Sequence, residues 1–280
     1  MTLKMRMSRI TEVLRIFNEL PINQVLCGDC LKVLRQFPEN SIDLILTDPP
    51  YNIASKNKIT FKSGGATTTE KAWGNTFNDE YSETDYEVFM LKLSVEFDRI
   101  LCDNGSIIIF FDRGKPYYLK PFYSLFHFRN MVTFVKKNPS PHVRKNNYRS
   151  TFEQCAWFSR DSYYINFISQ RKMKNVIVGL SGNLWPDSSF NVNMNPKQSK
   201  HPTEKYEWMI YPLIERHSKP GDVVLDPMCG SGSTLSCAKK LNRNYIGIDI
   251  DPQWVQASVD RVKKMPETLY GFMEVKTLDN

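Results

Sequence analysis

The chain has 280 residues, of which 24% are charged and 41% are hydrophobic, and its formal net charge is +7. No apolar run approaches the roughly eighteen residues of a membrane span, and the N-terminal segment lacks the continuous apolar block of a secretory signal. We therefore expect a cytoplasmic protein with a single domain over residues 1–280.

Apolar runs and breakers predict seven strands, in chain order near Ile22–Leu26, Ile42–Thr47, Ser106–Phe111, Met131–Val135, Phe152–Phe158, Val223–Leu225 and Tyr245–Ile248. Helical periodicity falls between them, at Leu31–Phe37, Ser82–Leu101, Lys115–Phe126, Glu204–His217, Gly232–Leu241 and Pro252–Lys264. This alternation predicts an α/β fold, a Rossmann-like seven-stranded and mostly parallel sheet with helices on both faces.

Two stretches interrupt the alternation. Residues 52–81 are polar, rich in Gly, Thr, Lys and Asn, and too long for a plain connection, so we expect a mobile loop or lid there. Residues 161–200 hold short β-like pieces at Tyr163–Ile168 and Val176–Val178. We interpret this second stretch as a small insertion outside the main sheet.

Two motifs each follow a predicted strand. The first is Thr47-Asp48-Pro49-Pro50-Tyr51, and the second runs from Leu225-Asp226-Pro227 through Cys229-Gly230-Ser231-Gly232 to Thr234. Because the carboxyl ends of strands are where open α/β sheets bind ligands, both motifs are expected at the ligand edge of the sheet. Together they indicate a methyl-transfer site.

The two motifs and their order resemble those of S-adenosylmethionine-dependent DNA amino-methyltransferases. The similarity is to the permuted group, in which the catalytic motif precedes the cofactor loop, and to its N6-adenine enzymes; it extends from Val25 to about Lys264. It implies S-adenosylmethionine as cofactor and double-stranded DNA as partner. A cognate restriction endonuclease, a homodimer, N4-cytosine or RNA as acceptor, and an idle nucleic-acid-binding module all remain open.

The first motif predicts the catalytic group. The Asp48 carboxylate and the Pro49 carbonyl can accept the two N–H bonds of an exocyclic amine, while Pro49 and Pro50 fix the turn. Tyr51 can stack on a base that has been extruded from the duplex. The alternative is a strand-terminating proline turn with a packed tyrosine. In the resembling family, N4-cytosine enzymes more often show Ser at the position of Asp48, which favours adenine.

The second motif predicts a cofactor loop. Gly230 and Gly232 allow close backbone approach, the helix that opens at Ser233 can hold a carboxylate, and Asp226 can bind an ammonium group. A structural turn is the alternative, and a phosphate loop would need a Lys after Gly232. The predicted cofactor-binding residues are Asp29, Cys30, Asp48, His201, Thr203, Lys205, Asp226, Pro227, Cys229, Gly230, Ser231, Gly232, Thr234 and Asp249.

Three acidic residues near strand ends have more specific roles. Asp249 lies about twenty residues past Gly230, the distance at which nucleotide-binding folds place a ribose acceptor. Asp251 is interpreted as a helix N-cap. The resemblance implies that Asp29 meets the adenine amine of the cofactor, and a helix N-cap is an equal alternative. It also implies that His201-Pro202-Thr203-Glu204-Lys205 contacts the methionine end, although Tyr206 replaces the Pro that is usual there.

A basic segment between two predicted strands is interpreted as the DNA contact, with a plain solvated loop as the alternative. Its predicted DNA-binding residues are Lys136, Lys137, Arg144, Lys145, Asn147 and Arg149. Residues 161–200 are the predicted target-recognition region, from position and family resemblance. No residue cluster has the spacing of a metal site, and Cys27 and Cys30 are interpreted as packing thiols.

Overall fold

A computed structural model describes residues 19–52, 81–136, 151–168, 173–178 and 204–265. Within these residues one sheet has the strand order β1-β8-β7-β2-β3-β5-β4-β6, and only the pairings of β5 are antiparallel. The strands are β1 (Gln24–Cys27), β2 (Ile42–Thr47), β3 (Leu101–Phe110), β4 (His127–Val135), β5 (Phe152–Ser159), β6 (Val176–Val178), β7 (Val223–Asp226) and β8 (Asn244–Asp249).

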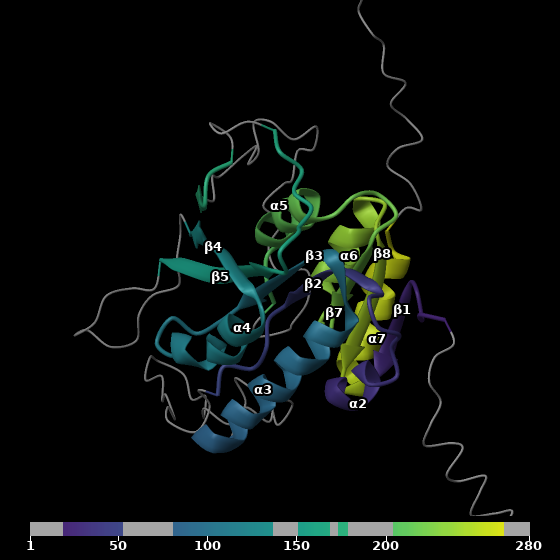
Figure 1. Cartoon of the computed structure of the whole chain (residues 1–280). Helices are drawn as coiled ribbons and strands as arrows, with labels where there is room; N and C mark the ends of the chain where they lie inside the picture. The colour runs from purple at the N-terminus through teal and green to yellow at the C-terminus, as the bar shows by residue number, and fades with distance from the viewer. Residues whose placement is uncertain (1–18, 53–80, 137–150, 169–172, 179–203, 266–280) are drawn as a thin grey trace, which may run out of the picture.

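Helices cover both faces of the sheet, as predicted (Figure 1). One face packs against α2 (Cys30–Leu34), α3 (Glu83–Ile100), the 3-10 helix η4 (Pro116–Leu119) and α4 (Lys120–Leu125). The other face packs against α5 (Glu207–His217), α6 (Ser233–Lys240) and α7 (Pro252–Lys263). The predicted Rossmann-like α/β class is therefore confirmed.

Alternation along the central strands produces these two cores. Ile107 and Ile109 of β3 belong to the core under α3, whereas Ile108 and Phe110 belong to the core under α5. All four side chains are fully buried. Because successive strand residues point to opposite faces, a strand covered on both sides is apolar at every position. This double burial holds the strand ends that carry the site.

The sheet has one strand more than the seven predicted. Residues Val176–Val178, interpreted from the sequence as part of an insertion outside the sheet, pair in parallel with Thr133–Val135 of β4. Val176 and Val178 are each 48% exposed, because this short strand lies at the sheet edge. Its three residues carry too little pattern to show that they join the main sheet.

Several boundaries also differ from the predicted ones. The helix predicted at Lys115–Phe126 is split into η4 and α4, with Pro121 in the first turn of α4, where a missing N–H is tolerated. Helix α5 begins at Glu207 instead of Glu204, and its N-cap Tyr206 is extended. Cys27 is exposed, not packed, because it ends the edge strand β1. No described helix is both long and apolar enough to cross a membrane.

Candidate active site

Three aspartates lie at the carboxyl ends of adjacent strands. Asp48 follows β2, while Asp226 ends β7 and Asp249 ends β8. Burial raises the pKa of the Asp226 carboxyl to about 7, and the charges of Asp48 and Asp249 add to this rise. The two sequence motifs therefore come together at one acidic ligand edge of the sheet.

Asp48 is held by two polar side chains. Its Oδ2 lies 2.6 Å from Lys205 Nζ, and its Oδ1 accepts a 2.5 Å hydrogen bond from the Tyr51 hydroxyl. The Lys205 side chain is only 10% exposed. Burial alone would lower the pKa of Lys205, but the charges of Asp48 and Glu153 help to raise it well above its ordinary value. Lys205 is therefore a cation beside the Asp48 carboxylate.

Glu153 and Lys136 extend this group of charges. Glu153 Oε2 lies 3.2 Å from Lys205 Nζ, and its Oε1 pairs with Lys136. Burial favours the neutral acid, but Lys205 and Lys136 keep the pKa of Glu153 below its ordinary value. Sequence reasoning missed Glu153. Its signal was a charge at the start of an apolar strand, and the reversed direction of β5 brings that start to the ligand edge.

The proline turn that carries Asp48 is tied to neighbouring elements. The Tyr86 hydroxyl of α3 donates to the Pro50 carbonyl, and Lys115 Nζ donates to the Asn52 carbonyl at 2.8 Å. Asn52 adopts a φ of 53°, in the left-handed region that asparagine tolerates better than most residues. These contacts tie the turn to α3 and to the N-cap of η4.

The predicted cofactor loop, Asp226–Thr234, is fastened to β8. Gly230 N–H donates to Asp249 Oδ2 at 2.9 Å, and Cys229 N–H donates to the Ile248 carbonyl at 2.9 Å. Gly232 is the N-cap of α6 with a φ of 78°, and no side chain caps this helix start. The first-turn N–H groups of α6 are thus placed to bind a carboxylate.

Asp226 fits the ammonium group that the cofactor loop is predicted to bind. The residue is 5% exposed, and one of its side-chain oxygens accepts a 3.2 Å hydrogen bond from Met228 N–H. A buried carboxylate without a cation beside it is costly, which is why burial raises its pKa. An ammonium group at this position would remove that cost. The loop therefore suits a ligand with adjacent amine and carboxylate groups.

Asp249 and Asp29 both bind backbone N–H groups. Asp249 Oδ1 accepts from Asp251 N–H at 2.9 Å, and its other oxygen binds the cofactor loop. Each carboxylate oxygen has two lone pairs, so acceptors for ribose hydroxyls remain. Asp29 is the N-cap of α2 and accepts a hydrogen bond from Leu31 N–H at 2.9 Å, as the alternative interpretation of this residue predicts. Asp251 is the N-cap of α7, as predicted.

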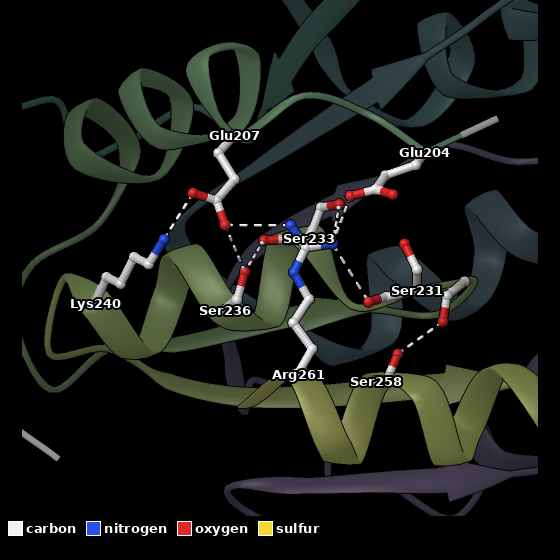
Figure 2. Close-up of polar contacts among 9 residues, drawn as sticks. Glu204, Glu207, Ser231, Ser233, Ser236, Lys240, Ser258 and Arg261 are labelled. Carbon is white, nitrogen blue, oxygen red and sulfur yellow. Dashed lines mark hydrogen bonds and ion pairs between the residues drawn. The ribbon is translucent and has the colours of Figure 1, made fainter. Parts of the chain in front are cut away.

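A charged cluster behind the cofactor loop was not predicted (Figure 2). Arg261 of α7 binds Glu204 Oε1 at 2.7 Å and Ser233 Oγ at 3.1 Å through Nη1, and Glu207 Oε1 at 3.1 Å through Nη2. Lys240 Nζ binds the other Glu207 oxygen at 2.6 Å. In sequence these residues resemble an ordinary solvated charge pattern, so only their burial distinguishes them.

Several predicted site residues lie outside the described parts of the chain. They are His201 and Thr203 of the cofactor set, and Lys137, Arg144, Lys145, Asn147 and Arg149 of the DNA-binding set. Most of residues 52–81 and of residues 161–200 lie outside as well. Lys136 is described and contacts Glu153, and its role in DNA binding stays a prediction.

Residues 42–260 match the family model for DNA methylases with N6 or N4 specificity. The match spans both strand-end motifs and most of the chain. The chain belongs to this DNA methylase family. It is a DNA methyltransferase that uses S-adenosylmethionine.

Two curated members of this family are similar over most of the chain. The type II methyltransferase M.HinfI of Haemophilus influenzae is 29% identical over 254 residues, which cover 87% of this chain and 69% of that protein. The type II methyltransferase M2.MboI of Moraxella bovis is 28% identical over 255 residues, covering 86% of this chain and 88% of that protein.

Solved DNA methyltransferases share the fold. The complex of M1.HpyAVI with S-adenosylmethionine superposes with a TM-score of 0.63 at 22% identity, covering 85% of this chain and 98% of that one. The cytosine-N4-specific PvuII DNA methyltransferase superposes with a TM-score of 0.62 at 18% identity, covering 87% and 88%. These likenesses confirm the Rossmann-like architecture.

Proposed function

We propose that this DNA methylase transfers a methyl group to the N6 amine of an adenine within a specific sequence of double-stranded DNA. The observation that carries this proposal is the partly buried Asp48 carboxylate, held by Lys205 and Tyr51 beside the cofactor loop. When bound, S-adenosylmethionine supplies an activated methyl group on a positively charged sulfur.

Asp48 and Pro49 have the central role in this proposal. The lone pair of an exocyclic amine is delocalised into the base and attacks poorly. The Asp48 carboxylate and the Pro49 carbonyl accept hydrogen bonds from the two N–H groups of the amine. These hydrogen bonds orient the lone pair of the amine toward the methyl group. Burial raises the pKa of the Asp48 carboxyl above its ordinary value, and the Lys205 ammonium opposes this rise and so favours the ionised form.

Tyr51 has two roles in the proposed cycle. Its hydroxyl donates to Asp48 Oδ1, the oxygen that does not face Lys205. When the target amine takes this oxygen, the Tyr51 ring stacks on the flipped base, which contributes about 1–3 kcal/mol. This offsets part of the few kcal/mol needed to extract the base from the duplex.

The remaining predicted residues bind the cofactor in this proposal. Asp226 takes the ammonium, the loop and the first turn of α6 take the carboxylate, and Asp249 takes the ribose hydroxyls. Asp29 and Cys30 at the end of β1 border the adenine, and His201 and Thr203 contact the methionine end. The location of Lys205 beside Asp48 favours a catalytic-side role for Lys205.

Cytosine N4 is the second candidate acceptor. The fold is shared with a cytosine-N4-specific enzyme, and both amines can be bound by the same pair of acceptors. Asp48 favours adenine, because Ser is more usual at this position in the N4 enzymes that the sequence resembles. A homodimer and a cognate restriction endonuclease stay predictions.

Nucleoside mass spectrometry tests the proposed acceptor. Unmethylated genomic DNA, treated with the enzyme and S-adenosylmethionine, is expected to contain N6-methyladenine. N4-methylcytosine alone would overturn the adenine assignment, and a product found only in RNA would overturn the DNA assignment.

The same assay tests the role of Asp48. Asp48→Ala is expected to lower methyl transfer at least about a hundredfold, the usual cost of losing one preorganised polar group. Its affinity for S-adenosylmethionine, measured by calorimetry, should stay within severalfold of the wild type. Near-normal transfer by this variant would refute the proposed site.

A further inference from the structure

The cluster behind the cofactor loop contains four charged side chains, two of each sign. The side chains of Glu204 and Arg261 are 3% and 7% exposed, and those of Glu207 and Lys240 are 13% and 22% exposed. Burial disfavours ionisation of Glu207, but Lys240 and Arg261 hold its pKa below the ordinary value. Glu207 is therefore held as a carboxylate between two cations.

Stability does not require such a cluster. Desolvation of buried ion pairs offsets most of their attraction, and apolar side chains of similar volume often stabilise a fold as well or better. What charges add is direction, because a guanidinium has five N–H donors in a rigid fork. The groups that the Arg261 guanidinium contacts therefore indicate the role of this side chain.

Arg261 joins the two halves of the site. Its Nη1 lies 3.1 Å from Ser233 Oγ and 3.5 Å from the Ser231 carbonyl, both in the cofactor loop. The same nitrogen lies 2.7 Å from Glu204 Oε1. Glu204 directly precedes Lys205, whose ammonium contacts Asp48. In Figure 2 the Arg261 side chain rises from α7 between the loop and Glu204.

We propose that Arg261 is a positioning residue that couples the cofactor loop to Asp48 through Glu204 and Lys205. This inference rests on the proposed roles of Asp48 and the loop. In this proposal Arg261 acts through the groups that it contacts, which are Glu204, Glu207, Ser231 and Ser233. It holds the loop in its binding shape and holds the extended segment 204–206 so that Lys205 reaches Asp48.

Loss of this coupling has a pH signature. The titratable and charged groups that face Asp48 are Lys205, Tyr51, Glu153 with Lys136 behind it, and Asp226. Lys205 is the cation that contacts the carboxylate. When Lys205 is no longer held there, its lowering effect on the pKa of Asp48 is lost, burial and the Glu153 charge still raise that pKa, and Asp48 protonates at higher pH. The acid limb of kcat then moves upward, because the reaction needs the carboxylate.

The decisive variants are Arg261→Met and Arg261→Lys. Arg261→Met is expected to weaken S-adenosylmethionine binding by about tenfold, measured by calorimetry without DNA, and to move the acid limb of kcat upward by roughly one pH unit. Arg261→Lys should recover part of both effects. Assays are run well below the melting temperature of each variant, so that loss of fold does not contribute.

Lys240→Met is the matched control. Lys240 belongs to the same cluster but reaches only Glu207 among its members, not the loop or Glu204. This variant should lower the melting temperature. Its cofactor affinity should stay within about twofold of the wild type, and the acid limb of kcat should stay within roughly 0.2 pH unit, which is about the precision of such measurements. Equal shifts in Lys240→Met and Arg261→Met would reduce the cluster to a structural role and overturn the proposal.

Glu204→Gln separates the contact of Arg261 with the cofactor loop from its link through Glu204 to Lys205. It replaces Arg261→Met if that variant fails to fold. It keeps the volume of Glu204 and leaves Arg261 bound to Ser233, so the acid limb should move while cofactor affinity changes little. Wild-type values for both quantities in Glu204→Gln and Arg261→Lys would refute the coupling. If the proposed function is wrong, the wild-type enzyme will produce no methylated base. The cofactor affinity measured without DNA would still test the contact between Arg261 and the cofactor loop.

Discussion

With Asp226 as the proposed ligand of the ammonium group, cofactor binding is expected to depend on pH. Its folded-state pKa is raised to about 7, above the ordinary value of an aspartate, chiefly because the carboxyl is buried. When the folded-state pKa of an acid is raised, its contribution to the stability of the folded protein is fully present below the unfolded-state pKa. This contribution is lost as pH rises through the folded-state pKa. Ionisation therefore destabilises the free protein, and it also creates the site for an ammonium group.

Affinity for S-adenosylmethionine should accordingly rise between about pH 6 and pH 8, as Asp226 ionises. Asp226→Asn should bind the cofactor at least about tenfold more weakly at pH 8, and its affinity should lose most of this pH dependence. Calorimetry at the two pH values measures both effects. An unchanged pH dependence in Asp226→Asn would assign the titration to another group.

The same variant should be more stable than the wild type when no ligand is present. At pH 8 we expect Asp226→Asn to raise the free energy of unfolding by about 1–3 kcal/mol, because a buried unpaired charge has been removed. At pH 5 the difference should be smaller, because the folded-state carboxyl is then protonated, and it should vanish only below the unfolded-state pKa of about 4. Urea unfolding at both pH values provides the measurement.

Sequence reasoning predicted the candidate site residues that lie within local motifs, and the structure brings these motifs together at one edge of the sheet. Asp48, Tyr51 and Asp226 stand next to prolines and glycines after strands, and that arrangement indicates a site without knowledge of the fold. Glu153 and Arg261 carry no such local signal. Their roles depend on the direction of β5 and on which face of α7 is buried, and both are set by tertiary packing.

At the scale of elements, the junction of the cofactor loop with α6 depends on glycine. Gly232 has a φ of 78°, and a Cβ there would lie 2.8 Å from Ser258 Oγ of α7. Ser258 Oγ also donates to the Gly230 carbonyl at 2.7 Å. A side chain at position 232 would therefore strain the backbone and push against the contact that supports the loop.

Gly232→Ala should destabilise the protein by about 2–4 kcal/mol, combining left-handed backbone strain with the clash. Gly221→Ala is the matched control, because Gly221 has a φ of 90° and a Cβ added there would meet nothing within 4 Å. It should cost only about 1–2 kcal/mol. Chemical unfolding gives both values, and cofactor affinity should fall in Gly232→Ala alone. Equal losses in the two variants would show that contact with α7 is unimportant.

The helices and central strands were largely predictable, because their patterns are long and their faces are buried. The eighth strand, β6, was not, since it has three residues and gains its partner only from β4. The split between η4 and α4 likewise depends on tertiary packing, because Tyr118, Leu119 and Phe122 of these short elements belong to the buried core that they share with α3. Short elements thus take their structure from neighbours more than from their own residues.

At the scale of the whole molecule, a net charge of +7 suits a polyanionic partner. Cations released from DNA phosphates make such binding strongly dependent on salt, whereas a small ligand in a buried site is much less affected. The two substrates should therefore respond differently to ionic strength.

Raising the salt concentration from about 50 to 200 mM should weaken DNA binding at least roughly tenfold, with much larger losses if many phosphates are contacted. Affinity for S-adenosylmethionine should change less than about twofold over the same range. Fluorescence anisotropy with labelled duplex and calorimetry with the cofactor measure the two effects. A flat salt response for DNA would contradict a phosphate-contacting surface.

The ends of β4 and β5 are held together where the chain connects these two strands. Lys136 N–H donates to the Thr151 carbonyl at 2.7 Å, so the chain leaves and re-enters the sheet at one point. Lengthening a connection whose ends are already clamped together adds little entropy cost, about 0.6 kcal/mol per doubling. A change in the length of the connection between Lys136 and Thr151 is therefore expected to leave the register of β4 and β5 intact.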